Sequence, residues 1–318
     1  RNTTADNNTA VGFNAMRCST EGQNNVAMGV CAMFCNTTAS SNIGIGRQAL
    51  YTNTTSVGNT ALGALALNLS TGANNPALGC GSLRNNSTGA NNTAVGFCSL
   101  NGNTTGSSNT ALGNNSMYQG TTTGDYNTMV GVNSGRKMTS GTQNTGMGVN
   151  SSELMTTGTN NTSFGMSSLG STTTGSCNTA FGHSALLSHT TGTRNTAVGN
   201  GALCDITNTQ DNTAIGYHAA RDSTANYTTA IGSEAVFRTT GSGNTGVGYR
   251  PLYLNTSGAH NTALGYYSLC SNTTGSNNVA VGCGALCGNT TANNNTAVGF
   301  CSLKTNITGT QNVAIGAC

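Results

Sequence analysis

Five residues, NTAVG, decide the fold of this chain, and they are written in full at Asn8–Gly12, Asn92–Gly96, Asn195–Gly199 and Asn295–Gly299. With the closing glycine as a marker, variants of the motif recur nineteen times, and fourteen of the eighteen steps between markers are 17 residues long. A fixed short period is typical of a solenoid, in which each coil packs against its neighbours. We therefore predict a single repetitive body of about 19 coils over residues 1–318.

The residues around the motif predict a parallel all-β fold. We number the columns of the repeat from the asparagine, so that the marker glycine is column 5. Column 4 is apolar in every copy and column 2 is mostly threonine, and both alternate with small residues at columns 3 and 5. Period-two alternation with β-branched residues predicts a strand, and we expect columns 2 and 4 to face the coil interior. Alanine or serine at column 8 and leucine or methionine at column 9 predict a second inward segment.

The Asn-Thr-Thr-Gly stretch that follows predicts a turn without core residues. The marker glycine predicts a positive φ or a close backbone approach. Column 1 is asparagine in eighteen of nineteen copies, which predicts a ladder of amides about 4.8 Å apart, each donating to the next carbonyl. Ladder members are Asn8, Asn25, Asn42, Asn59, Asn92, Asn109, Asn195, Asn261, Asn278, Asn295 and Asn312.

Composition argues against several partners. Only 6% of residues are charged and the net charge is +3, so no nucleic-acid footprint is present. No apolar run reaches the length of about 18 residues that a membrane span needs. The sequence starts at Arg1 and stops at Cys318, both in mid-repeat, so we expect a processed or partial product of a longer precursor.

Twelve cysteines suggest an oxidising compartment. Three pairs are 17 residues apart and occupy the same column of neighbouring coils, which places their Cα atoms within disulfide range. The pairs are Cys18 with Cys35, Cys270 with Cys287 and Cys301 with Cys318, and a less regular fourth pair is Cys80 with Cys98. Buried reduced thiols remain the alternative.

Glycosylation sequons recur in one turn column. Their asparagines are Asn2, Asn36, Asn53, Asn86, Asn103, Asn255, Asn272, Asn289 and Asn306. A turn is a suitable place for an exposed acceptor, although tight turns select the same residues without any sugar.

Catalytic and metal-binding patterns are missing from the sequence. The four histidines fall in different columns, the eight acidic residues pair at no repeated position, and no Cys-x-x-Cys is present. We therefore predict no enzyme activity, no metal and no cofactor.

Several segments resemble the heads of YadA-type trimeric autotransporter adhesins, whose repeats are like SVAIGxxA. NVAVGCGAL at Asn278–Leu286, NVAIGA at Asn312–Ala317 and NTAIGYHA at Asn212–Ala219 match that pattern. The longer NTALGYYSLCSNTTGSNNVAVG at Asn261–Gly282 is similar to repeat arrays in tail and surface fibres of phages and large viruses. The resemblance implies a left-handed β-roll and a homotrimer used in adhesion. The flat strip of small residues at columns 3 and 5 suggests the contact between subunits.

Three functions are compatible with these patterns. The first is a self-assembling fibre segment on a virion or cell surface, outside the cell. The second is an adhesin that binds a receptor, host matrix or glycans through divergent coils over residues 125–240, which carry Arg136, Lys137, Glu153, Asp205, Asp211, Asp222 and Arg238. The third is ice binding, disfavoured by the expected inward direction of column 2. The phase of the repeat at the two ends also suggests head-to-tail stacking into a filament.

Overall fold

The computed structural model describes residues 4–317, and their contacts group the chain into two compact units, Arg1–Asn161 (unit 1) and Thr162–Cys318 (unit 2). The described residues contain no helix and nineteen strands, each three residues long. This confirms the predicted all-β solenoid with a repeat of about 17 residues. The left-handed path and the single body over residues 1–318 stay predictions.

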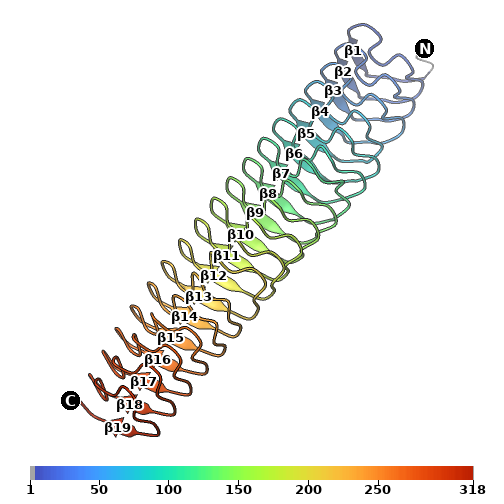
Figure 1. The fold of residues 1–318 in the computed structure, drawn as a ribbon. Coiled ribbons are helices and arrows are strands. Elements are labelled where there is room, and N and C mark those ends of the chain that lie inside the picture. The colour runs from blue at the N-terminus through green and yellow to red at the C-terminus, as the bar shows by residue number, and fades with distance from the viewer. Residues whose placement is uncertain (1–3, 318) are drawn as a thin grey trace. The chain divides into compact units, whose positions relative to one another are not determined.

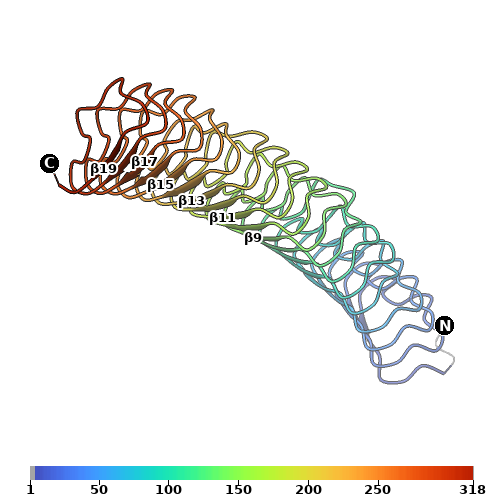
Figure 2. The ribbon, with the colours of Figure 1, turned by 90° about the horizontal axis from the view of Figure 1, so that it is seen from below.

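In each unit the strands pair in parallel and in chain order (Figure 1). The strands of unit 1 are β1 (Thr9–Val11), β2 (Val26–Met28), β3 (Ile43–Ile45), β4 (Thr60–Leu62), β5 (Pro76–Leu78), β6 (Thr93–Val95), β7 (Thr110–Leu112), β8 (Thr128–Val130) and β9 (Thr145–Met147). The strands of unit 2 are β10 (Thr162–Phe164), β11 (Thr179–Phe181), β12 (Thr196–Val198), β13 (Thr213–Ile215), β14 (Thr229–Ile231), β15 (Thr245–Val247), β16 (Thr262–Leu264), β17 (Val279–Val281), β18 (Thr296–Val298) and β19 (Val313–Ile315). In unit 2 the strands lie along one side of the coils and the loops on the other (Figure 2).

The strands face the opposite way from the prediction. The column 3 residues Ala94 and Ala111 are fully buried, whereas the column 4 residues Val11 and Leu112 are 53% and 43% exposed. Columns 2 and 4 therefore point outward and column 3 points into the coil. The prediction that column 3 forms a flat outer strip for subunit contact is wrong for the same reason.

Columns 3 and 9 of one coil exchange a small and a large side chain, and this exchange explains the orientation of the strands. In most coils a small residue at column 3 faces a leucine or methionine at column 9. The coil of β8 instead has Met129 at column 3 and Gly135 at column 9, and a Cβ on Gly135 would lie 2.8 Å from Met129 Cγ. The two columns thus share one narrow space, which holds one large side chain. A large residue at column 3 in every coil would overfill it.

The second inward segment is confirmed. Column 8 residues such as Ser99 and Ala202, and column 9 residues such as Leu100 and Leu186, are fully buried. Column 9 belongs to the apolar cluster of its own unit in both units. Most column 9 residues also have a left-handed backbone, with φ of 51° at Leu100 and 54° at Leu186. This conformation costs about 1–2 kcal/mol for a residue with a Cβ, and the buried side chain offsets that cost.

The marker glycine meets both predicted conditions. Its φ is +132° at Gly96, and a Cβ there would lie 2.5 Å from Gly113 O in the next coil. Only glycine fits, because the backbone conformation and the approach of the next coil both exclude a side chain.

We expect Gly96→Ala to lower the free energy of unfolding by about 2 kcal/mol or more, because the backbone of the next coil would have to move. Gly81→Asn is the matched control. Gly81 lies at column 7, where other coils carry asparagine, and its φ is +68°. A Cβ at Gly81 would lie 3.2 Å from its nearest neighbour, Cys98 Sγ. Urea unfolding followed by circular dichroism compares the two variants. Equal stability of both variants would contradict this account of the marker column.

Candidate functional surfaces

Column 1 asparagines connect each coil to the next from inside. Asn92 is fully buried, its Nδ2 donates to Gly106 O at 2.8 Å, and its Oδ1 accepts the backbone N–H of Asn109 at 2.9 Å. In unit 2, Asn278 makes the equivalent bonds and also donates to Asn261 Oδ1 at 3.2 Å. The predicted amide-to-amide bond therefore occurs, and the more regular link runs from the side-chain oxygen to the next backbone N–H. All column 1 asparagines except the half-buried Asn8 and Asn312 are buried, so their amides serve contacts within the chain.

The sequon asparagines form a second buried ladder at column 12. Asn103 Nδ2 donates to Asn86 Oδ1 at 2.7 Å and to Gly106 O at 2.9 Å, and Asn272 Nδ2 donates to Asn255 Oδ1 at 2.8 Å. Seven of the nine sequon asparagines are fully buried, Asn306 is half-buried, and Asn2 lies outside the described residues.

The predictions of exposed acceptors and of a turn without core residues are therefore wrong. A glycan on any of the seven buried amide nitrogens is incompatible with this fold, because each nitrogen is enclosed. The Asn-Thr-Thr-Gly composition suggested an exposed turn, but a buried ladder of asparagine amides at column 12 uses the same residues.

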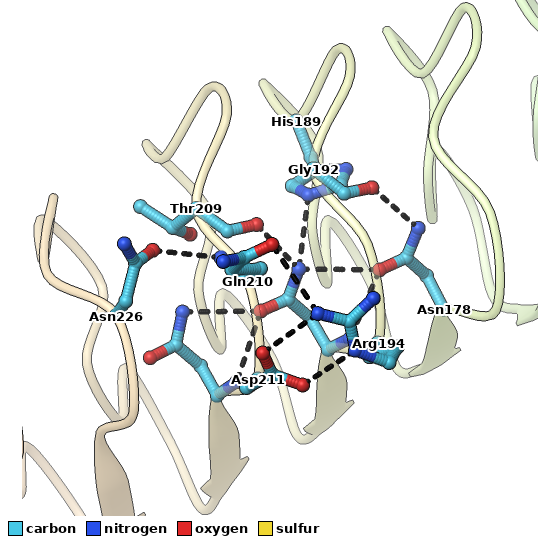
Figure 3. Close-up of polar contacts among 10 residues, drawn as sticks. Asn178, His189, Gly192, Arg194, Thr209, Gln210, Asp211 and Asn226 are labelled. Carbon is cyan, nitrogen blue, oxygen red and sulfur yellow. Dashed lines mark hydrogen bonds and ion pairs between the residues drawn. The ribbon is translucent and has the colours of Figure 1, made fainter.

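His189 replaces asparagine in column 12 of unit 2 (Figure 3). Its side chain is fully buried, and Asn195 Nδ2 lies 3.1 Å from its Nε2. Because an amide nitrogen only donates, this contact is a hydrogen bond only in the tautomer that carries the ring proton on Nδ1. Nδ1 has no hydrogen-bond partner among residues 4–317. Burial lowers the pKa of His189 to about 4, against a smaller opposing effect of Thr209.

We expect the stability of the protein to fall as the pH decreases from about 6.5 to about 4, because the unfolded chain binds a proton at His189 that the folded chain excludes. The loss is about 3 kcal/mol at most and is absent above pH 6.5. His189→Asn supplies the residue that other coils use and should remove this component. Urea midpoints at pH 7 and pH 4.5 measure it.

His260→Asn is the control for this series, since His260 is exposed. A wild-type pH dependence that is unchanged by His189→Asn would show that buried His189 does not cause it.

Cys270 and Cys287 lie side by side in neighbouring coils. Their Sγ atoms are 2.8 Å apart, and the structure holds both as thiols. Burial, with the hydrogen bond from Cys270, raises the pKa of the Cys287 thiol to about 11. Burial and the neighbouring Cys18 raise the pKa of Cys35. Burial and, to a smaller extent, the neighbouring Cys80 raise the pKa of Cys98, whereas Arg84 lowers it. Cys318, the predicted partner of Cys301, lies outside the described residues.

We expect Cys270 and Cys287 to form a disulfide under mild oxidation and to stabilise the protein by about 3 kcal/mol, as a loop of about 15 residues does. Alkylation of the unfolded protein with and without reductant, read by peptide mass, measures the bridge. Cys177→Ser, which changes an exposed cysteine, is the control for Cys270→Ser. Complete alkylation of both residues without reductant after oxidation would refute the pairing.

The charged residues of the divergent coils mostly pair along the solenoid. Arg136 pairs with Glu153 at 2.7 Å, Arg221 with Asp205 at 3.1 Å and Arg238 with Asp222 at 2.9 Å. Arg194 donates to both carboxylate oxygens of Asp211, at 2.6 and 2.8 Å (Figure 3). Each pair joins adjacent coils and is partly exposed, so it contributes at most about 1 kcal/mol. The charges are therefore used mainly within the chain.

The outward side of the sheets carries an exposed apolar surface. We call columns 4 and 6 together the apolar face. In unit 1 its members include Phe13, Leu62, Phe97 and Leu112, which are 43–72% exposed. In unit 2 its members include Met166, Phe181, Ile215, Tyr217, Ile231, Tyr249, Leu264, Tyr266 and Phe300, which are 36–59% exposed. Sequence reasoning missed this surface because it placed column 4 inside.

Comparison with protein-family models finds no matching model, and comparison with curated proteins finds no significant match. Residues 4–317 contain no helix with the length and apolar character of a membrane span. Within the same residues, no three histidine, cysteine, aspartate or glutamate side chains are placed to hold a metal ion.

Proposed function

We propose that this chain is a structural segment of a fibre on a virion or cell surface, and that copies of it associate laterally through the apolar face. The observation that carries the proposal is the exposure of column 4 in coil after coil, as at Leu112 and Ile215. Monomeric soluble proteins rarely leave such large apolar surfaces in water. The resemblance to trimeric adhesin heads and fibre repeats favours three copies.

The size of the face supports a stable contact. The nine residues of the apolar face in unit 2 are about half exposed. Large side chains of this kind bury about 200 Å² each, so the nine offer on the order of 800 Å². That is about the area each partner contributes to a standard protein interface. One unit thus has enough apolar surface for a subunit contact.

We expect the wild-type chain to have three times its 31.8 kDa mass in solution, and Ile215→Glu with Leu264→Glu to be monomeric. Two buried carboxylates without partners cost more than the contact provides. Light scattering after size exclusion measures the mass. The control is Ile307→Glu, which changes a residue in column 13 that is 57% exposed, against 40% for Ile215 and 36% for Leu264.

A monomeric wild-type protein, or dissociation by Ile307→Glu, would overturn the role of the apolar face. Electron microscopy of the same samples distinguishes lateral trimers from head-to-tail filaments, which remain the second mode of assembly that we consider.

Ice binding is a second candidate that one observation favours. Column 2 points outward, contrary to the expectation that disfavoured this function, and seven of its threonines lie in register in unit 2. They are Thr162, Thr179, Thr196, Thr213, Thr229, Thr245 and Thr262. Large apolar side chains at column 4 of the same strands, such as Phe181 and Ile215, interrupt the regular surface beside them. A trimer formed through the apolar face would also cover column 2, so the mass in solution separates the two functions.

A further inference from the structure

Three pockets lie around columns 10 to 13 of neighbouring coils, two in unit 1 and one in unit 2. One pocket of unit 1, beside Asn101 and Tyr118, has no arginine among the described residues that line it. The other two combine an aromatic ring with an arginine. The Phe34 pocket has a volume of about 620 Å³ and is lined by Arg17, Cys18, Thr20 and Phe34. The Phe237 pocket has a volume of about 260 Å³ and is lined by Phe237, Arg238, Tyr253, Leu254 and Thr256. The hollow is a general feature of these columns, and the Phe34 and Phe237 pockets differ from the third in having an arginine beside the ring, Arg17 from the coil before Phe34 and Arg238 next to Phe237 in sequence.

An aromatic ring of column 10 lines one wall of each of these two pockets and stacks on the corresponding ring of the next coil. Phe34 stacks on Tyr51 with centroids 5.2 Å apart, and Phe237 stacks on Tyr253 with centroids 5.4 Å apart. Because the rings of adjacent coils cover one another's faces, their edges are left to contact a ligand. Ring edges carry the positive end of the aromatic quadrupole, so this wall is apolar and favours electronegative atoms.

A guanidinium group lies beside each wall. Arg17 Cζ is 5.5 Å from the centroid of Phe34, and Arg238 Cζ is 5.5 Å from that of Phe237. Arg17 is exposed. Arg238 uses its Nε to bond Asp222, and 70% of its side chain remains exposed. Each pocket therefore has a positive group fixed at the aromatic wall and open to solvent.

Threonine hydroxyls add hydrogen-bond acceptors. Thr20 Oγ1 donates to Thr37 O at 3.2 Å, and Thr256 Oγ1 donates to Thr273 O at 2.9 Å. At Thr256 this bond uses the hydroxyl hydrogen, and the hydroxyl oxygen has lone pairs that can accept from a ligand hydroxyl. No carboxylate is among the described residues that line the two pockets.

We propose that these two pockets bind an acidic saccharide. Oxygen atoms of a sugar contact the ring edges of the aromatic wall, its carboxylate or sulfate pairs with the guanidinium, and its hydroxyls donate to the threonine oxygen. The net charge of +3 favours an anionic ligand over a cationic one. Two sites on one chain, multiplied by assembly into a fibre, increase avidity for a surface that carries many such groups. Saccharide binding would add receptor recognition to the proposed structural role, and it does not depend on trimer formation.

Isothermal titration at about 150 mM salt, where weak surface charge is screened, tests the proposal. The probes are a heparin-derived hexasaccharide, a hexamer of galacturonic acid, a neutral hexamer of N-acetylglucosamine and a hexaglutamate peptide. We expect saturable binding of an acidic saccharide at two sites per chain and none of the neutral hexamer. Binding of the heparin hexasaccharide alone would mean that sulfate is required. Binding of the galacturonic acid hexamer would mean that a carboxylate is sufficient.

Arg17→Gln and Arg238→Gln should each remove one of the two sites, and the double variant should lose at least tenfold in affinity. Arg47→Gln is the matched control, since it removes the same charge from an exposed residue of column 6. Phe237→Leu keeps an apolar residue and should weaken the unit 2 site severalfold through loss of the ring. Thermal melts verify that each variant is folded.

Three results would overturn the proposal. They are the absence of saturable binding to both acidic saccharides, equal weakening by Arg47→Gln, and equal affinity for hexaglutamate. The last two would mean that the protein attracts any polyanion through diffuse charge.

Discussion

The carbonyl of column 15 receives the side-chain amide of column 1 from its own coil in most coils, and it receives a second amide where column 12 is asparagine. The packing of the coil depends on this contact. At Gly106 the donors are Asn92 from column 1 and Asn103 from column 12, at 2.8 and 2.9 Å. Strands of three residues supply few backbone bonds, so the interior asparagines hold the loop against the strand. Each bond contributes about 1 kcal/mol net, and repetition along the solenoid makes the sum large. A buried polar network that is satisfied in this way also specifies one register.

The interior of each coil has little space for large apolar side chains. Two asparagines, a small residue at column 3, a small residue at column 8 and one leucine or methionine at column 9 fill the coil. Gly44 illustrates how closely these groups fit, because a Cβ there would lie 2.8 Å from Met33 Cγ. The large residues of column 4 have no place inside and so point into solvent. A polar interior and an apolar exterior are two consequences of one constraint, and the exterior then favours association with other copies.

The functions that we propose for this chain both use its outer columns. The apolar face is proposed to contact other copies, and the columns that carry the stacked rings and arginines are proposed to bind an acidic saccharide. His189 shows the opposite case, a titratable side chain enclosed where asparagine belongs. Its ring is held neutral by burial, so we expect it to affect stability.

The repeat period, the parallel β-solenoid, the glycine of column 5 and the interior asparagines of column 1 could all be predicted from the sequence alone. Each of these follows from a local requirement that recurs in every copy, such as the positive φ at Gly96. What only the tertiary structure decided is which side of each strand is inside. Alternation defines two faces but does not say which is buried, because that depends on residues across the coil, as Met129 and Gly135 show. The burial of Asn103 and the exposure of Leu112 both follow from that choice. The pockets at Phe34 and Phe237 also needed the structure, because their walls combine residues from neighbouring coils whose stacking no single repeat contains.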